Sequence, residues 1–273
     1  MTDAECTAFL QWALPRLGRR WAGFRKVRRL VAKRLARRLR ALGLADLDAY
    51  RGWLQTHPEE WAELDALLGI PISRFWRDRA VFESIERDVL PALADAARAA
   101  GRTTLDAWSA GCASGEEPYT LAILWRERLQ RGYPALELRI VATDSDARLI
   151  ERARSGCYSA SSLKDLPPDL RAAAFEERDG RSCVRAEYRA VEFMCQDLRE
   201  SMPAGPFDLV LCRNVVATYY AQDVQRALFA RIAERMRPGG ALVLGVHEAL
   251  PQGMTGFETW AGRRAIYRRT GDR

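Results

Sequence analysis

The sequence predicts an α/β fold in which a doubly wound, mostly parallel sheet domain follows an all-helical N-terminal domain. Residues 1 to 95 show helical periodicity, whereas from Thr103 onward short apolar runs bounded by turn residues alternate with helical segments. Such alternation is typical of a sheet covered by helices on both faces. With 273 residues and 48% hydrophobic content, the chain can bury a real core in one large or two smaller domains. We place the two domains at residues 1–95 and 96–273.

A basic amphipathic helix is the main feature of the N-terminal domain. Its apolar stripe has spacings of four, four, four and three, and consists of Val27, Val31, Leu35, Leu39 and Leu42. Gly43 is the expected stop. Residues 1–45 contain twelve Lys and Arg against two acidic residues, a net of +10, whereas the rest of the chain has 31 basic and 34 acidic residues, a net of −3.

Three interpretations of this basic helix remain open. Its charged side is exposed only to solvent, or docks an acidic protein, or binds nucleic acid. No interleaved aromatic residues support nucleic-acid binding. We rank docking first, with the solvated face close behind, and expect no nucleic acid as a partner.

The other expected elements follow in order along the chain. Two short helices are parted at His57-Pro58, and a longer helix ends near Gly101. Strands are expected within 103–111, 137–146, 207–215 and 239–248, with an antiparallel edge hairpin within 257–269. The segment 183–198 alternates weakly and predicts a small strand excursion before the sheet resumes.

Bulk properties exclude several classes of protein. No apolar run approaches the roughly 20 residues of a membrane span, and the first residues do not resemble a secretory signal. We therefore expect a cytoplasmic monomer without membrane insertion. The six cysteines are scattered without CxxC spacing and are expected to be reduced thiols. Only His57 and His247 are available, so we expect no metal site and little general-base chemistry.

The stretch "LDAWSAGCASGEEPYTLAILW", residues 105–125, predicts a buried strand, a loop of small residues and a helix that opens with two glutamates. A phosphate is disfavoured because Glu116 and Glu117 stand where it would bind and no GxxxxGK[ST] lysine is present. S-adenosylmethionine fits better, because its sulfonium and ammonium groups are cationic and its ribose diol can donate to a carboxylate. The alternative is a tight strand-to-helix turn whose glutamates complement the helix dipole.

Polar residues follow the carboxyl ends of the expected strands, where open α/β sheets bind ligands. Asp144 ends the second strand, one helix and one strand after the glycine loop, which is where an acidic residue holds a ribose diol in nucleotide-binding sheets. Asp197 and the pair Arg213-Asn214 lie near two other strand ends. A strand-end aspartate is otherwise often a helix N-cap, but the preceding loop favours ribose binding.

Five stretches in this order resemble the motifs of the CheR family of chemotaxis receptor glutamate methyltransferases. They are "RFWRDRAVF", "GCASGEEPYTLAI", "VATDSD", "FDLVLCRNV" and "RPGGALVLGVHEAL". The resemblance covers most of the chain and includes the basic helix. It implies a class I, Rossmann-like S-adenosylmethionine domain behind a helical N-terminal domain, with a small inserted β-subdomain that we place at about 180–195.

The resemblance also implies the site residues. Beside Gly111 of the loop, the family's cofactor contacts carry over onto Arg77, Glu117, Asp144, Leu198, Arg213 and Asn214, with Ser73 and Asp197 where the family usually shows Thr and Asn. Arg77 is the residue that we expect to hold the cofactor or the substrate carboxylate, because its planar fork matches a carboxylate. Without the resemblance, a surface arginine paired with Asp78 or Glu83 would be preferred.

This chain departs from the family pattern at the substrate end. Pro71 and Ile72 replace two polar residues, and "GVHE" replaces a GHSE phrase, which places Val246 and His247 there. In "CRNVVATYY", Thr218 stands at the usual tyrosine and Tyr219 follows one residue later. Either Tyr219 replaces the missing tyrosine, or the pocket is rebuilt for another acceptor.

Methyl transfer to a carboxylate suits the small number of histidines, because a carboxylate is already ionised near neutral pH. The resemblance implies an S-adenosylmethionine-dependent O-methyltransferase that acts on glutamate side chains of a chemoreceptor-like protein, with S-adenosylhomocysteine as product. An acidic helical partner, such as a chemoreceptor cytoplasmic domain, would bind the basic helix. The alternatives are a relative retargeted to another protein or small-molecule acceptor, and a cofactor-binding module without turnover.

Overall fold

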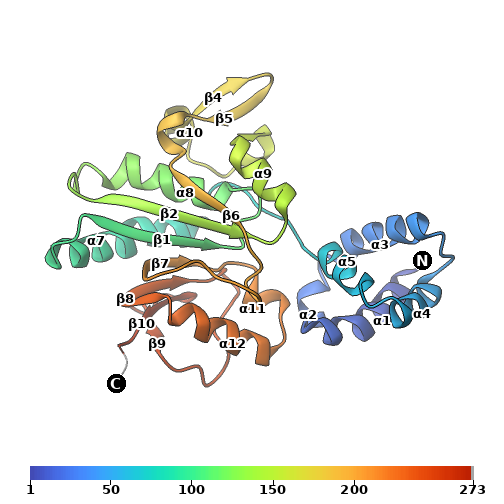
Figure 1. Cartoon of the computed structure of the whole chain (residues 1–273). Coiled ribbons are helices and arrows are strands. Elements are labelled where there is room, and N and C mark those ends of the chain that lie inside the picture. Colours follow the sequence, from blue (N-terminus) through green and yellow to red (C-terminus); the bar gives the residue numbers. More distant parts are fainter. Residues whose placement is uncertain (272–273) are drawn as a thin grey trace. The chain divides into compact units, whose positions relative to one another are not determined.

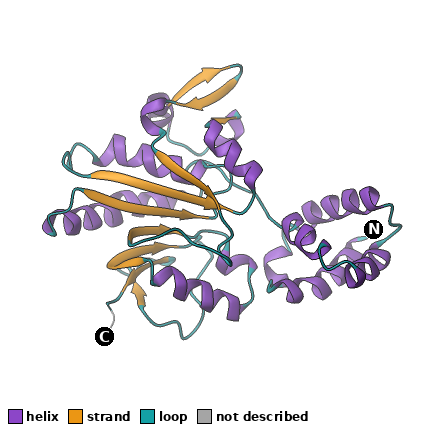
Figure 2. Ribbon diagram, in the orientation of Figure 1, coloured by secondary structure: helices purple, strands orange, loops and turns teal. Residues whose placement is uncertain are grey.

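A computed structural model describes residues 1–271 and divides the chain into two compact units (Figures 1 and 2). The helical unit consists of Met1–Ile70 together with the returning segment Val215–Gln225. The sheet unit consists of Pro71–Asn214 and the chain from Arg226 onward. Each unit is described by itself below.

The helical unit is built from short helices around a core of its own, as the sequence predicts. Its elements are α1 (Asp3–Ala13), the 3-10 turn η1 (Leu14–Leu17), α2 (Trp21–Phe24), α3 (Arg28–Leu42), α4 (Leu47–Thr56), α5 (Glu60–Leu67) and α11 (Val216–Tyr219). A capping box of Thr2 and Glu5 starts α1. Helix α12 (Gln222–Ala233) begins in the returning segment and continues in the sheet unit.

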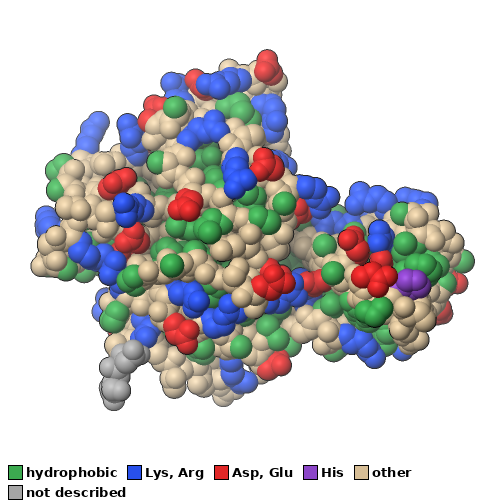
Figure 3. Space-filling view, viewed as in Figure 1, with side chains coloured by type: hydrophobic (Ala, Val, Ile, Leu, Met, Phe, Trp, Pro, Cys, Tyr) green, Lys and Arg blue, Asp and Glu red, His purple; other side chains and the backbone are tan. Residues whose placement is uncertain are grey.

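Helix α3 is the predicted basic helix, with one face buried in the core and the other exposed. Val31, Leu35 and Leu39 are buried in the core of the unit, and Gly43 ends the helix with a φ of 68°. Lys and Arg side chains gather over α3 in Figure 3. Its exposed cations are Arg29, Lys33, Arg37 and Arg40.

Two arginines of α3 instead hold the helical unit together. Arg34 donates to the carbonyl oxygens of Leu67 and Gly69. Arg38 forms a fork with the carboxylate of buried Glu60, which also accepts from Tyr50 Oη at 2.6 Å. Burial opposes ionisation of Glu60, but the hydrogen bonds from Arg38 and Tyr50 outweigh it and hold the pKa of Glu60 below its ordinary value. Part of the basic surplus is therefore structural.

The sheet unit contains a seven-stranded mixed sheet, in the order β6-β2-β1-β7-β8-β10-β9. The strands are β1 (Thr104–Ala110), β2 (Glu137–Asp144), β6 (Val191–Cys195), β7 (Phe207–Leu211), β8 (Met236–Val243), β9 (Phe257–Thr259) and β10 (Ile266–Arg269). The first five are parallel, and β10 runs antiparallel to both β8 and β9. The predicted strands and the edge hairpin are confirmed. All five parallel strands present their carboxyl ends at one edge.

Helices flank this sheet (Figure 1). They are α6 (Arg79–Ser84), α7 (Leu90–Ala99), α8 (Glu116–Leu124) and α9 (Ala147–Ser155). The short π-helix η2 (Ile85–Val89) joins α6 to α7, and the short π-helix η3 (Trp125–Leu129) extends α8. The periodicity predicts that the helical stretch from residue 79 to residue 95 belongs to the N-terminal domain. In the structure it belongs to the sheet unit, because Phe82, Ile85 and Leu90 share one core with strand residues such as Leu105.

A second, three-stranded antiparallel sheet is inserted after α9, in the order β3-β5-β4. Its strands are β3 (Cys157–Tyr158), β4 (Phe175–Arg178) and β5 (Arg181–Val184), with η4 (Ala160–Leu163), α10 (Pro168–Ala174) and η5 (Ala186–Tyr188) around them. The β-subdomain predicted at about 180–195 thus lies earlier, at 157–184. The segment 191–195 is β6 of the main sheet, because Ile140 to Asp144 pair with it.

The cysteines also differ from the expectation of six thiols. Cys157 and Cys183 are directly opposite in the β3–β5 register and form a disulfide. Cys6, Cys112 and Cys212 are buried and Cys195 is exposed, and these four cysteines are not in a disulfide. The sequence shows no CxxC signal for this pair because the pairing of two strands that are not consecutive in the chain, β3 and β5, brings it together across 26 residues.

Two kinds of feature are absent from residues 1–271. Across that range, no helix has both the length and the apolarity that crossing a membrane requires. Within the same range, no group of three or more His, Cys, Asp or Glu is arranged to hold a metal ion.

Candidate active site

The loop of small residues lies where β1 and β2 end side by side. Ala110 pairs with Thr143 at the last step of the parallel register. The N–H groups of Gly111 and Cys112 both donate to the Thr143 carbonyl oxygen, at 2.8 and 2.9 Å. Gly111 has a φ of 77° and Gly115, which caps α8, has a φ of 90°. The two glycines let the backbone turn sharply.

Asp144 is the carboxylate that faces this loop. Its Oδ2 accepts from the N–H of Ala113 at 2.9 Å, and its Oδ1 accepts from the N–H of Asp146 at 3.0 Å. Burial raises the pKa of Asp144, whereas the backbone hydrogen bonds from Asp146 and Ala113 act in the opposite direction. Each oxygen keeps acceptor capacity for a ligand hydroxyl. Asp146, two residues on, is the N-cap of α9, so the cap role is taken by a different aspartate.

Glu117 and Arg213 form a buried ion pair across the sheet edge. Arg213 Nη1 donates to Glu117 Oε2 at 2.9 Å, and Ser109 Oγ donates to Glu117 Oε1 at 2.7 Å. Arg213 Nη2 donates to Asp78 Oδ2 at 2.9 Å and to the Arg77 carbonyl oxygen at 2.6 Å. The Arg213 side chain is 2% exposed. Its single positive charge is paired with two carboxylates, those of Glu117 and Asp78. Three segments far apart in the sequence are thereby tied together.

Backbone strain concentrates in the same region. Of the non-glycine residues with positive φ, four lie in the segments just described, namely Trp76, Asp78, Ala113 and Asn214. A non-glycine residue in this conformation is unusual and is found preferentially at functional sites. Asn214 is held by the Glu248 carboxylate, as described below.

The other predicted cofactor residues are placed as follows. Ser73 and Arg77 are half-buried and precede α6, and Arg77 Nη1 donates to the Ile72 carbonyl oxygen. The two alternative partners proposed for Arg77 are engaged elsewhere, Asp78 with Arg213 and Glu83 with Arg79.

Asp197 and Leu198 follow β6. Arg199 donates to both carboxylate oxygens of Asp197, and Leu198 is buried. Asp197 therefore meets a cation within its own turn. An adenine amino group would have to share this carboxylate with Arg199.

Thr218 and Tyr219 belong to the returning segment of the helical unit. The Tyr219 ring packs against Phe24 with centroids 5.1 Å apart, and the Thr218 carbonyl oxygen accepts from Arg20 Nε at 3.1 Å. A Cβ at Gly23 would meet that carbonyl oxygen at 2.3 Å, so only glycine allows this approach. Their catalytic role stays a prediction.

Sequence reasoning missed two further groups at this edge. Asp78 is the second carboxylate on Arg213. Gln196 precedes Asp197, and its backbone N–H donates to the Asp144 carbonyl oxygen at 2.9 Å. Its side-chain oxygen is buried without a hydrogen-bond partner among the described residues. A buried acceptor of this kind calls for a donor, which an adenine amino group or a ribose hydroxyl would provide.

Glu248 is a third missed residue and closes the site on the far side. Its Oε2 accepts from the N–H groups of Asn214 and Gly245, both at 2.7 Å. A Cβ at Gly245 would meet Glu248 Oε2 at 2.7 Å and Asn214 Oδ1 at 2.9 Å. One carboxylate thus fixes the turns that follow β7 and β8.

Replacing Glu248 by Ala should release the Arg213-Asn214 turn. Two charge-assisted hydrogen bonds are lost, each worth about 1.5 to 3 kcal/mol, so we expect at least a tenfold weaker affinity for S-adenosylhomocysteine by calorimetry. Glu248→Gln keeps an acceptor oxygen and should recover most of the affinity. An Ala variant that binds normally would limit Glu248 to a structural role.

The residues at this edge fit S-adenosylmethionine. Asp144 offers a carboxylate to a diol, and Gln196 offers an unpartnered acceptor. The carboxylates of Glu117 and Asp78 suit the cationic end of the cofactor, although Arg213 already neutralises part of their charge. The chain supplies no lysine here that would favour a phosphate.

Comparisons with known proteins agree with this interpretation. Residues 72–266 match the "CheR methyltransferase, SAM binding domain", and residues 26–68 match the "CheR methyltransferase, all-alpha domain". The "Chemotaxis protein methyltransferase" of Salmonella typhimurium is 34% identical over 230 residues, which cover 81% of this chain and 76% of that protein. That of Escherichia coli is 33% identical over 231 residues, with the same coverage.

Other similar proteins are longer or more distant. An "Uncharacterized 104.1 kDa protein" of Rhodobacter capsulatus is 34% identical over 87% of this chain, but the chain spans only 25% of its length. Among solved structures, the N-methyltransferase NodS of Bradyrhizobium japonicum in complex with S-adenosylhomocysteine has a TM-score of 0.33 at 16% identity, covering 62% of this chain and 63% of that one. The glycopeptide N-methyltransferase MtfA complexed with sinefungin has a TM-score of 0.33 at 14% identity, covering 63% and 54%.

The sheet order, with its antiparallel strand beside β8, and the loop at the carboxyl edge define a class I S-adenosylmethionine-dependent methyltransferase. Within that class, the chain belongs to the CheR methyltransferase family.

Proposed function

We propose that the protein transfers the methyl group of S-adenosylmethionine to glutamate side chains of a chemoreceptor-like protein. The observation that carries this proposal is the match to both family domains, together with the loop, Asp144 and Arg213 at one sheet edge. The relatives named as chemotaxis methyltransferases support the choice of acceptor.

The proposed reaction needs no general base from the protein. The bound cofactor supplies an electrophilic methyl group on a sulfonium. The acceptor carboxylate is ionised near neutral pH, so the chain has to orient it and exclude water. Arg77 uses one N–H on the Ile72 carbonyl oxygen, and its remaining guanidinium donors are available for a carboxylate. We propose it as the residue that orients the cofactor or acceptor carboxylate.

A methylation assay tests the proposal. The purified protein is offered radiolabelled S-adenosylmethionine and a glutamate-rich fragment of a chemoreceptor cytoplasmic domain. We expect label in the fragment that is released as methanol at alkaline pH, because methyl esters are base-labile. A fragment with its glutamates replaced by glutamine is the matched control. Incorporation of alkali-stable label, or none, would refute glutamate methylation.

We propose the exposed face of α3 as the docking surface for this acidic partner. Arg29, Lys33 and Arg37 are spaced four residues apart, so they lie on one side of the helix. Their charge is not used in the core, unlike that of Arg34 and Arg38. Complementary charge increases the rate of association and is screened over about 8 Å at physiological salt.

Charge reversal on this face should separate docking from cofactor binding. Arg29→Glu, Lys33→Glu and Arg37→Glu together are expected to slow association with the receptor fragment at least tenfold at low salt. Surface plasmon resonance gives this rate, and calorimetry should show unchanged affinity for S-adenosylhomocysteine. Arg40→Glu, nearer the end of α3, is a single-charge control with a smaller effect. If the triple variant associates at the normal rate and salt has no effect, the face is only solvated.

One observation favours a second candidate, a relative retargeted to another acceptor. Ile72 and Val246 are 49% and 43% exposed and are large apolar residues in the loops that flank Arg77 and Glu248. Both stand at positions where the sequence departs from the family pattern. If the receptor fragment is not methylated, carboxylate acceptors with an apolar neighbour are the next substrates to test in the same assay.

A further inference from the structure

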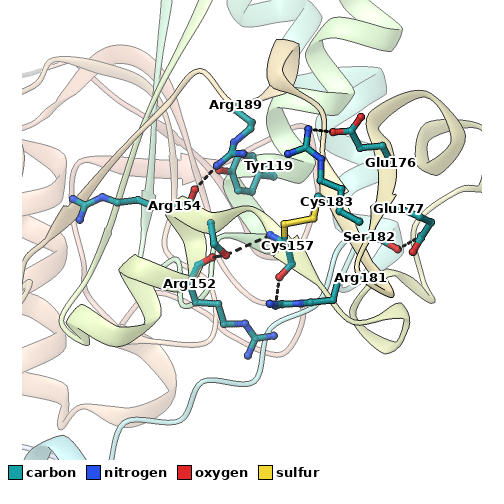
Figure 4. The surroundings of a disulfide bond; sticks show 12 residues. Tyr119, Arg152, Arg154, Cys157, Glu176, Glu177, Arg181, Ser182, Cys183 and Arg189 are labelled. Atoms are coloured by element: carbon teal, nitrogen blue, oxygen red, sulfur yellow. Dashed lines mark hydrogen bonds and ion pairs between the residues drawn. A yellow bond between two sulfur atoms is a disulfide. The ribbon is translucent and has the colours of Figure 1, made fainter.

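The disulfide of the small sheet lies one residue from Tyr158, which contacts the loop of small residues at 111–115. We call this loop the cofactor loop. Cys157 and Tyr158 are the whole of strand β3, and their partners in β5 are Cys183 and Ser182. The disulfide therefore fixes half of the register that holds this strand. Arg181, the first residue of β5, also donates to the Cys157 carbonyl oxygen (Figure 4).

Tyr158 reaches from this strand to the loop. Its side chain is fully buried, and its hydroxyl donates to the Ser114 carbonyl oxygen at 2.7 Å. A Cβ on Gly115 would lie 3.0 Å from the same hydroxyl, so the loop and the Tyr158 ring are in close contact. The neighbouring Ala113 is the residue whose N–H donates to Asp144. A shift of β3 would thus be transmitted to the loop that the cofactor faces.

The same strand also contacts the segment that carries Arg77. The Phe75 ring meets the Tyr158 ring edge-on with centroids 4.9 Å apart. The Phe75 N–H donates to the carbonyl oxygen of Ser162 in η4, which follows β3, at 3.0 Å. Two sides of the candidate site therefore rest on the few residues that follow Cys157.

We propose that Cys157 and Cys183 form a thiol–disulfide exchange site whose redox state sets the affinity of the cofactor loop. Cys157 is half-buried and Cys183 is 2% exposed, so an incoming thiolate attacks the sulfur of Cys157. A mixed disulfide forms and Cys183 leaves as a thiolate. A second thiol then attacks the outer sulfur, which yields two protein thiols and one oxidised reductant. The reductant is a small thiol or a dithiol protein.

The chemistry around the pair suits exchange. Figure 4 shows Arg181 beside Cys157, and Arg189 close to Tyr119, where it donates to the Arg154 carbonyl oxygen. Nearby guanidinium groups favour the thiolate form on which exchange depends. Glu176, the register partner of Cys183, is paired with Arg178. Disulfides in a reducing compartment are usually transient or redox-sensing, so a reversible role fits the cytoplasmic location that we expect.

Counting thiols tests the first half of the proposal without any ligand. The full-length protein is oxidised with diamide, denatured, and alkylated with N-ethylmaleimide before mass spectrometry. We expect four alkylated cysteines, and six when dithiothreitol precedes alkylation, because Cys6, Cys112, Cys195 and Cys212 are not in the disulfide. Six alkylated cysteines without reduction would overturn the proposal.

Calorimetry with S-adenosylhomocysteine tests the second half. We expect reduction to weaken binding about fivefold, the lower range of typical allosteric couplings, and to speed amide hydrogen exchange of residues 111–119. The double variant Cys157→Ser, Cys183→Ser should match the reduced protein and ignore dithiothreitol, whereas Cys195→Ser should still respond. Equal affinity and equal exchange of both redox states would refute the coupling. If neither state binds the ligand but exchange still differs, the proposed cofactor site and the control of affinity fail, and only a redox effect on the mobility of the loop stands.

Discussion

Replacing Arg213 by Met is expected to lower the free energy of unfolding of the sheet unit by about 3 to 5 kcal/mol, because it removes one partner of a buried ion pair. The carboxylates of Glu117 and Asp78 lose their shared cation while 14% and 21% of their side chains remain exposed. The contact of the guanidinium with the Phe82 ring, 5.0 Å from its centroid, is lost as well. Urea unfolding followed by circular dichroism measures the change.

A matched variant separates stability from ligand binding. Arg102 makes a comparable fork with Asp208, whose side chain is 4% exposed, at the amino ends of β1 and β7 and away from the loop. Arg102→Met should destabilise the unit similarly but leave affinity for S-adenosylhomocysteine unchanged, whereas Arg213→Met should weaken both. If both variants bind equally well, Arg213 has only a structural role.

The second large effect concerns Asp144. Asp144→Ala removes a charge-assisted hydrogen bond worth about 1.5 to 3 kcal/mol and should weaken binding of S-adenosylhomocysteine at least tenfold in calorimetry. Asp146→Asn, two residues on, alters the N-cap of α9 but not the carboxylate that faces the loop. It should therefore bind within about twofold of the unmodified protein, well under the 1.4 kcal/mol of a tenfold change.

The pH dependence of binding follows from the raised pKa of Asp144. Burial raises this pKa above 3.8, so the folded protein holds a proton to a higher pH than the unfolded chain. The ionised carboxylate binds the diol, and affinity should fall as the pH drops through the raised pKa, starting above 3.8. The free energy of unfolding should change oppositely, decreasing as pH rises through the same window. Asp144→Asn should remove both dependences, and a variant that keeps them would assign the titration to another group.

Much of the fold was predictable because its signals are local. The apolar runs of β1, β2, β7 and β8 are bounded by turn residues, and the stripe of α3 needs only helical spacing. Gly111 and Asp144 were predictable as parts of a site for the same reason, since a strand end and a loop of small residues are visible in a short window.

The remaining features depend on partners far apart in the sequence. Arg34 and Arg38 belong to the basic helix that we rank as a docking surface, but Gly69 and Glu60 bind them within the helical unit. Glu248 acts on a turn 34 residues earlier, and the Cys157–Cys183 pair depends on the register between β3 and β5, which are not consecutive strands. The apolar stripe of the helical stretch 79–99 would suit packing in either unit. Only the observed contacts with strand residues assign the stretch to the sheet unit.

A crystal structure of the protein with S-adenosylhomocysteine tests the central claim most directly, that these strand ends form the cofactor site. We predict both ribose hydroxyls within about 3.2 Å of the Asp144 carboxylate, and the Gln196 side-chain oxygen in contact with a ligand donor. A ligand bound elsewhere, or a ribose that does not contact Asp144, would contradict the account.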